Sequence, residues 1–189
     1  MNKQLVLVGG GVRSGKSTFA LERARALGKR RVFVATAQAF DDEMRDRITR
    51  HQAERSDDDF RTVEEPIELA QALARIEQAD VVVIDCLTLW LSNLLLRDLT
   101  VSQIVERVDE VVAVLARRAF HAIVVTNEVG MGVVPESALG RAFRDVSGLA
   151  HQRLARVADE IDVAILGTVL RIKPAPVQIQ NGDPREATE

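Results

Sequence analysis

A glycine-rich run near the start of the chain contains the residue types that bind phosphate groups. Its sequence is Gly10-Gly11-Val12-Arg13-Ser14-Gly15-Lys16-Ser17, which fits the pattern G-x-x-x-x-G-K-[ST]. Glycines let backbone N–H groups close around phosphate oxygens, because no Cβ stands in the way. The ammonium of Lys16 is expected to reach the β- and γ-phosphates of a nucleoside triphosphate, and the hydroxyl of Ser17 to bind Mg²⁺. The run therefore predicts a nucleotide-binding loop.

A carboxylate at the end of an apolar run is the second candidate. Asp85 directly follows the run 81–84, which reads as a buried strand. In proteins with such a phosphate loop, an acid at a strand tip orders the shell of the magnesium ion. Ser17 and Asp85 are therefore the predicted metal-site residues, whereas the acidic run 57–59 is expected to be a solvated loop.

His51 is the histidine whose position packing explains least. Met44, Ile48, His51 and Arg55 share one face of a helix predicted from Asp41 or Asp42 to about residue 55. One interpretation is a partly buried histidine that is satisfied by hydrogen bonds. The other is a nucleophile that attacks phosphorus and forms a covalent intermediate. His121, at a strand entry, and His151, in the middle of a helix, lack comparable surroundings.

These residues need a scaffold of alternating strands and helices. Strands are predicted at 4–8, 31–35, 81–85, 122–126 and 163–167, with 169–172 extending the last, and helices at 17–24, 41–55, 67–76, 87–96, 101–115 and 137–158. This alternation predicts an α/β fold of the P-loop NTPase type, with a mostly parallel sheet and helices on both faces. Ligands bind such sheets at the carboxyl ends of the strands, where we expect the phosphate loop, residues 36–38, Asp85, residues 126–128 and residues 167–168 to gather.

Composition excludes several classes of protein. The chain has 189 residues, of which 47% are hydrophobic, so we expect one catalytic domain over residues 1–173 and a flexible tail over 174–189. A net charge of -3 and an aromatic content of 4% argue against nucleic-acid binding. No apolar run is long enough to span a membrane, and the single cysteine suits a reducing cytoplasm.

Five blocks of the sequence resemble a known enzyme family. They are the phosphate loop, Ala35-Thr36-Ala37 with the runs 41–44 and 47–48, the run 61–66, the run 85–88 with 93–95, and Thr126-Asn127-Glu128-Val129-Gly130-Met131-Gly132-Val133-Val134-Pro135. Together they resemble the bifunctional adenosylcobinamide kinase/adenosylcobinamide-phosphate guanylyltransferase of cobalamin biosynthesis, from about residue 9 to about residue 172. The phosphate loop is generic, whereas the last block is specific to this family.

The resemblance implies a two-step enzyme with a RecA-like fold that forms a homo-oligomer. It phosphorylates adenosylcobinamide with ATP or GTP, then joins GMP from GTP to adenosylcobinamide phosphate and releases pyrophosphate. By the same resemblance, His51 carries the GMP as a covalent intermediate. The implied GTP contacts are residues 10 to 17 together with Ala35, Thr36, Ala37, Gln52, Ala53, Glu54, Arg55, Glu64 and Asp85.

Two alternatives stay open at the level of sequence. One is a P-loop small-molecule kinase that performs no guanylyl transfer and in which His51 is structural. The other is a RecA-like regulatory ATPase. The Asn-Lys-x-Asp signature of GTPases is absent, so the preference for guanine rests on the resemblance alone.

Overall fold

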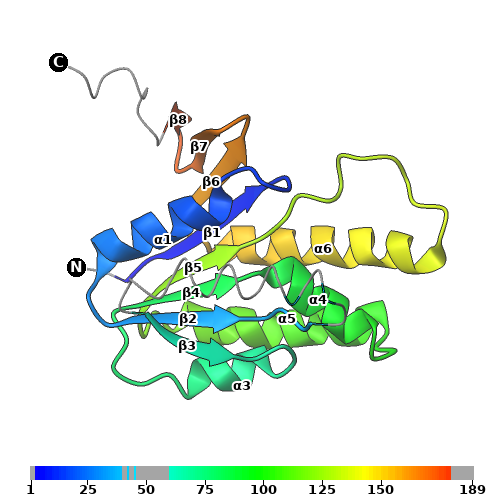
Figure 1. Ribbon diagram of the computed structural model, residues 1–189, viewed down its shortest axis with the longest axis horizontal. Coiled ribbons are helices and arrows are strands. Elements are labelled where there is room, and N and C mark those ends of the chain that lie inside the picture. The colour runs from blue at the N-terminus through cyan, green and yellow to red at the C-terminus, as the bar shows by residue number, and fades with distance from the viewer. Residues whose placement is uncertain (1–2, 40–41, 43–44, 46–59, 180–189) are drawn as a thin grey trace.

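The computed structural model describes residues 3–39, 42, 45 and 60–179 (Figure 1). The helices are α1 (Lys16–Leu27), α3 (Leu69–Ala74), α4 (Leu87–Leu95), α5 (Val101–Ala116) and α6 (Ala138–Val157). The strands are β1 (Leu5–Gly10), β2 (Arg31–Ala35), β3 (Phe60–Glu64), β4 (Val81–Asp85), β5 (His121–Val125), β6 (Glu160–Ile165), β7 (Thr168–Lys173) and β8 (Gln178–Ile179).

The strands form one sheet in the order β3-β2-β4-β5-β1-β6-β7-β8. The strands from β3 to β6 in this order run parallel, and β7 and β8 are antiparallel additions at one edge. The predicted α/β fold with a mostly parallel sheet is therefore confirmed. In this order β5 lies between the strand that precedes the phosphate loop, β1, and the strand that ends in Asp85, β4.

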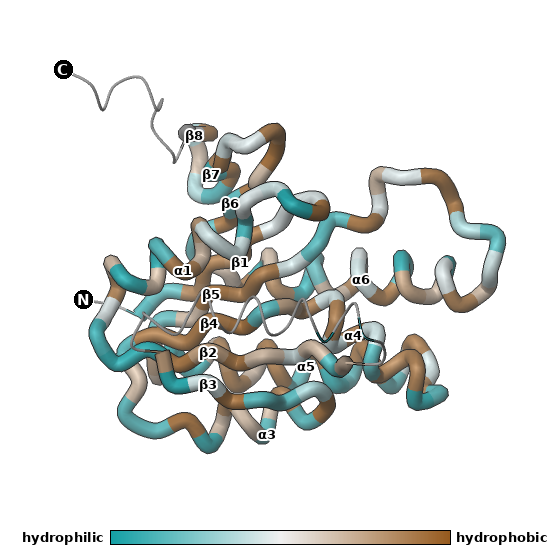
Figure 2. Tube along the Cα trace, in the orientation of Figure 1, coloured by the Kyte–Doolittle hydropathy of each residue, from teal (hydrophilic) through white to brown (hydrophobic). Residues whose placement is uncertain are grey.

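Alternating side chains of the strands form two hydrophobic layers. Leu5 and Leu7 belong to a core that is shared with α3, α4, α5 and α6. Val6 and Val8 point to the opposite face, where α1 covers them with Ala20 and Ala24. Figure 2 shows hydrophobic residues concentrated in the central strands, which are buried on both sides. Helices thus cover both faces, as the sequence predicts.

Helix α4 is buried within the chain, including Trp90, whose indole N–H donates to the carbonyl of Ile67 at 2.8 Å. This packing within the chain accounts for the apolar sequence of α4. Helix α5 begins with a capping box. Thr100 accepts from the backbone N–H of Gln103, and the Gln103 side chain accepts from the backbone N–H of Thr100.

Two parts of the sheet differ from the prediction. Strand β3 is missed because it lies at the sheet edge and its residues are partly or fully exposed, so it has no continuous apolar run. Residues 169–172 were expected to extend the preceding strand, which is wrong. The chain instead reverses at Leu166 and Gly167, which both have positive φ angles of 51° and 78°, and β7 returns antiparallel to β6.

The predicted tail and the helix predicted at 41–55 are described only in part. Residues 178–179 of the predicted tail form β8, which pairs with Leu170 and Arg171 of β7, and residues 180–189 lie outside the description. Most of the helix predicted at 41–55 also lies outside it. Among the described helices, none combines the length and the hydropathy that a membrane span requires.

Candidate functional site

The phosphate loop connects the end of β1 to the start of α1, as predicted from its sequence. A Cβ at Gly10 would come within 2.6 Å of the carbonyl oxygen of Ala164 and 2.7 Å of the hydroxyl of Ser14, so only glycine fits there. Gly15 has a φ of 88°, in the left-handed region that glycine adopts without strain. These two glycines therefore set the path of the loop.

Lys16 and the start of α1 supply positive charge to this loop. The Lys16 side chain is buried, and its Nζ donates to the carbonyl of Gly11 at 2.9 Å, across the loop. The N-cap residue of α1 is Gly15, which has no side chain to cap the helix, and the first turn holds no acidic residue. The first N–H groups of a helix lack intrahelical acceptors, so this end of α1 is suited to bind an anion.

The predicted metal-site residues lie on the same edge of the sheet. Asp85 is the last residue of β4, and Ser17 is in the first turn of α1, which packs against β4 through Ala20 and Ala24. A carboxylate and a hydroxyl are hard oxygen ligands of the kind that Mg²⁺ prefers. Within the described residues, no group of three or more His, Cys, Asp or Glu side chains is arranged to hold a metal ion. Mg²⁺ commonly takes one or two protein carboxylates and completes its shell with phosphates and water, so the pair suits a nucleotide-bound ion.

The strand register aligns the predicted nucleotide contacts across the sheet. Glu64 pairs with Ala35, Ala35 with Asp85, Asp85 with Val125, and Val125 with Val8. Neighbouring strands are about 4.8 Å apart, so Glu64 lies about 19 Å along the sheet from β1. Glu64 is therefore too far from the phosphate loop to contact the same phosphate group.

Buried hydrogen bonds join the segments that follow β2, β4 and β5 at this edge of the sheet. The Thr36 hydroxyl accepts from the backbone N–H of Cys86 and donates to its carbonyl, both at 2.8 Å. The Asn127 side chain donates to the Thr88 hydroxyl at 2.8 Å. The Asn93 side chain donates to the carbonyl of Thr36 at 2.8 Å. These bonds connect the ends of β2, β4 and β5, so the loops that follow them are held in a fixed relation.

Several predicted site residues lie outside the described residues. They are the proposed nucleophile His51 and the predicted GTP contacts Gln52, Ala53, Glu54 and Arg55. Their roles stay predictions.

His151 has polar partners that its sequence context does not reveal. Its Nε2 lies 2.7 Å from the hydroxyl of Thr126, and its Nδ1 lies 4.0 Å from a carboxylate oxygen of Glu128. Burial lowers the pKa of His151, and the nearby Glu128 carboxylate raises it by a smaller amount. Sequence reasoning missed this cluster because Thr126 and His151 are 25 residues apart and meet only when α6 packs beside β5.

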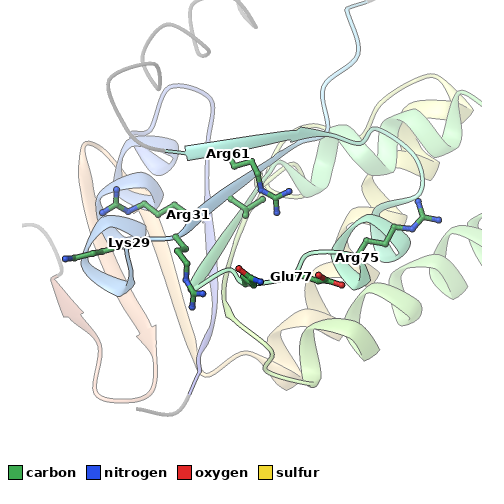
Figure 3. Close-up of a pocket in the computed structure, with 8 residues that line it drawn as sticks. Lys29, Arg31, Arg61, Arg75 and Glu77 are labelled. Carbon is green, nitrogen blue, oxygen red and sulfur yellow. The ribbon is translucent and has the colours of Figure 1, made fainter.

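A basic pocket of about 570 Å³ lies away from this edge (Figure 3). Its cations are Lys29, Arg30, Arg31, Arg61 and Arg75. Arg31 begins β2 and Arg61 is the second residue of β3, so the pocket lies at the amino ends of these strands. The phosphate loop follows the carboxyl end of β1, which runs in the same direction. The pocket is therefore separate from the candidate nucleotide site.

The chain is similar to several known proteins. A family model described as cobinamide kinase / cobinamide phosphate guanyltransferase matches residues 6–172. The bifunctional adenosylcobalamin biosynthesis protein CobP of Pseudomonas aeruginosa is 39% identical over 172 residues, which cover 90% of this chain and 98% of that protein. The bifunctional adenosylcobalamin biosynthesis protein CobU of Escherichia coli is 37% identical over 182 residues, covering 89% and 99%. A solved structure of the RadB recombinase has a TM-score of 0.49 and 17% identity, covering 90% of this chain and 80% of that one.

Proposed function

Because the chain belongs to the cobinamide kinase / cobinamide phosphate guanyltransferase family, we propose that it catalyses both reactions of that name. In the first, it transfers the γ-phosphoryl group of ATP or GTP to the aminopropanol hydroxyl of adenosylcobinamide. In the second, it transfers GMP from GTP to the resulting phosphate, giving adenosylcobinamide-GDP and pyrophosphate. The observation that carries the proposal is the family match over residues 6–172, and the phosphate loop between β1 and α1 supports it.

The phosphate loop serves both reactions, because both consume a triphosphate. Lys16 leaves the Gly11 carbonyl, to which it donates in this structure, and pairs with the β- and γ-phosphates. The N–H groups at the start of α1 bind the same phosphates. Ser17 and Asp85 would hold a magnesium ion, which would supply positive charge against the phosphates when bound. The hard oxygen donors of these two side chains support this assignment.

In the guanylyl transfer, His51 acts as the nucleophile. An imidazole nitrogen attacks the α-phosphorus of GTP, the bond to the bridging oxygen breaks, and pyrophosphate leaves. A phosphate oxygen of adenosylcobinamide phosphate then attacks the same phosphorus and displaces His51. Dividing the transfer in this way replaces one difficult step with two easier ones. The family membership supports this role for His51.

The remaining nucleotide contacts follow the same family pattern. We assign Ala35, Thr36, Ala37, Glu64 and the run 52–55 to the GTP. The separation of about 19 Å between Glu64 and β1 supports a contact of Glu64 with the guanosine rather than with the terminal phosphates.

Two labels on GTP test the proposed function. The purified protein is incubated with adenosylcobinamide, Mg²⁺ and GTP labelled either at the γ- or at the α-phosphate. We expect the γ-label first in adenosylcobinamide phosphate and then in adenosylcobinamide-GDP, and the α-label only in adenosylcobinamide-GDP, with release of one pyrophosphate for each α-label transferred. A γ-label in the corrinoid without any α-label would reduce the protein to a plain kinase. Triphosphate hydrolysis with no label in the corrinoid would contradict both reactions.

A further inference from the structure

The polar cluster of Thr126, His151 and Glu128 has no part in the reactions described so far. Thr126 is buried, and its hydroxyl lies 2.7 Å from Nε2 of His151. On the other side of the ring, Nδ1 lies 4.0 Å from one oxygen of Glu128. The second oxygen of Glu128 accepts from the backbone N–H of Gly130. One carboxylate oxygen is thus held by a backbone N–H and the other faces the His151 ring, while 37% of the Glu128 side chain stays exposed to a ligand.

Two backbone hydrogen bonds fix this cluster beside the phosphate loop. The N–H of Thr126 donates to the carbonyl of Val8 at 2.9 Å, and the N–H of Glu128 donates to the carbonyl of Gly10 at 3.0 Å. Gly10 is the first residue of the phosphate loop. Glu128 is therefore attached to the loop that binds the triphosphate, at the end of the strand next to β1.

The other carboxylates at the carboxyl edge of the sheet lie farther from β1, and one of them is already assigned to the metal site. Asp85 ends β4, two strand spacings or about 10 Å from β1, and is assigned to the metal site. Glu64 ends β3, four strand spacings from β1. Glu128 follows β5, which is the immediate neighbour of β1. Among the described carboxylates of this edge, Glu128 is the one placed to meet an acceptor group at the end of the triphosphate.

We propose that Glu128 is the general base of the kinase reaction and that His151 positions its carboxylate. The inference rests on the proposed function, because it requires an alcohol as the phosphoryl acceptor. The hydroxyl oxygen forms a bond to the γ-phosphorus, while the bond from that phosphorus to the β–γ bridging oxygen breaks. The nucleoside diphosphate leaves with that electron pair. The hydroxyl proton passes to Glu128 and from there to solvent.

The contacts of His151 indicate how it positions the Glu128 carboxylate. When the Thr126 hydroxyl donates to Nε2, the ring proton is on Nδ1 and points toward Glu128. Catalytic hydrogen bonds are often long before substrate binds, so the 4.0 Å separation closes through a small rotation of either side chain. The burial of His151 favours the neutral ring. A neutral N–H orients the carboxylate without placing a full positive charge beside the base.

The test measures two rates separately. One is the phosphorylation of adenosylcobinamide, and the other is the labelling of the protein by α-labelled GTP. In Glu128→Gln, we expect the kcat for phosphorylation of adenosylcobinamide to fall at least about 100-fold. The KM values for both substrates and the rate of protein labelling by α-labelled GTP should stay within about threefold of the parent, because neither depends on removal of the hydroxyl proton. Glu136→Gln is the matched control. Glu136 lies in the same connection between β5 and α6, and its substitution should leave every rate unchanged.

His151 is tested by comparing two replacements. His151→Phe should lower the kinase kcat about 10-fold with little change in KM, and His151→Gln should recover part of the loss, since its amide can donate to Glu128. A merely structural role would lower the thermal stability and both reactions together.

The inference is overturned if folded Glu128→Gln keeps the parental kinase kcat, or if it loses labelling by GTP to the same degree as kinase activity. A parent protein that is labelled by GTP but phosphorylates no corrinoid contradicts the proposed function, and the inference falls with it. Retained kinase activity in the variant, by contrast, leaves the proposed function intact.

Discussion

Glu160 and Asp162 are buried together on the face of β6 that α1 covers. They pair with Val6 and Val8 of β1, and Glu160 forms an ion pair with Arg23 of α1 at 3.0 Å. Arg171 of β7 lies 3.6 Å from the same oxygen of Glu160. Asp162 is fully buried, and neither of its carboxylate oxygens has a hydrogen-bond partner among the described residues. Burial, followed by the charge of Glu160, raises the pKa of Asp162 to about 7.

This pair makes the stability of the protein depend on pH. The unfolded state loses the Asp162 proton near pH 4, whereas the folded state keeps it until about pH 7. Between these values the folded state binds more protons, so the contribution of Asp162 to the free energy of unfolding falls as the pH rises. Asp162→Asn removes this dependence and should be more stable than the parent by about 1–3 kcal/mol at pH 8, with a smaller difference at pH 4. Denaturant unfolding of both proteins from pH 4 to pH 8 measures the difference. Two parallel curves would contradict the buried proton on Asp162.

Lys16 should be required for both reactions. Lys16→Ala removes the cation that binds the β- and γ-phosphates, so we expect kinase activity and labelling by GTP to fall at least about 100-fold each. Rates measured separately for the two reactions check this. Lys29→Ala, an exposed lysine in the basic pocket at the amino ends of the strands, is the control and should leave both rates unchanged. Loss of one reaction only in Lys16→Ala would show that the two reactions use different triphosphate sites.

The single thiol should be unreactive in the folded protein. Cys86 is only 4% exposed, and burial raises its pKa to about 11, so little thiolate forms at pH 8. Iodoacetamide at pH 8 should therefore alkylate the native protein far more slowly than the protein unfolded in urea, as mass spectrometry over time can follow. Equal rates in the two states would mean that the end of β4 opens readily to solvent.

The capping box of α5 gives a prediction for stability. Thr100→Ala removes the hydroxyl that accepts from the N–H of Gln103, which should cost about 1 kcal/mol. In a chain of this size, that loss lowers the Tm by about 2–4 °C. Ser102→Ala changes an exposed residue within the same helix and should leave the Tm nearly unchanged. Thermal unfolding of the two variants compares them directly, and an equal Tm for both would contradict the role of the cap.

Much of the fold was predictable because its strands and helices have strong local signals. The runs that became β1, β2, β4 and β5 are almost wholly apolar, and the phosphate loop has a specific pattern. The edge strand β3 has no such signal, because one side of it lacks a neighbouring strand and its residues alternate little in hydropathy. The turn at Leu166 was missed because leucine with a positive φ is uncommon.

The candidate site was predictable only where its residues are close in sequence or at strand tips. Gly10 to Ser17 form one continuous run, and Asp85 follows an obvious strand. The contact between Thr126 and His151 depends on how α6 packs beside β5, which no local pattern specifies. The same holds for the bond between the Glu128 N–H and the Gly10 carbonyl, which brings together residues more than a hundred positions apart.

The central claim is that one chain transfers both a phosphoryl group and GMP, the latter through His51. The most direct measurement incubates the parent and His51→Ala with Mg²⁺ and α-labelled GTP, and then counts label on the denatured protein. The account predicts an acid-labile label on the parent and none on His51→Ala, while the variant still phosphorylates adenosylcobinamide. Equal labelling of both proteins, or no label on a folded parent that binds GTP, would contradict it.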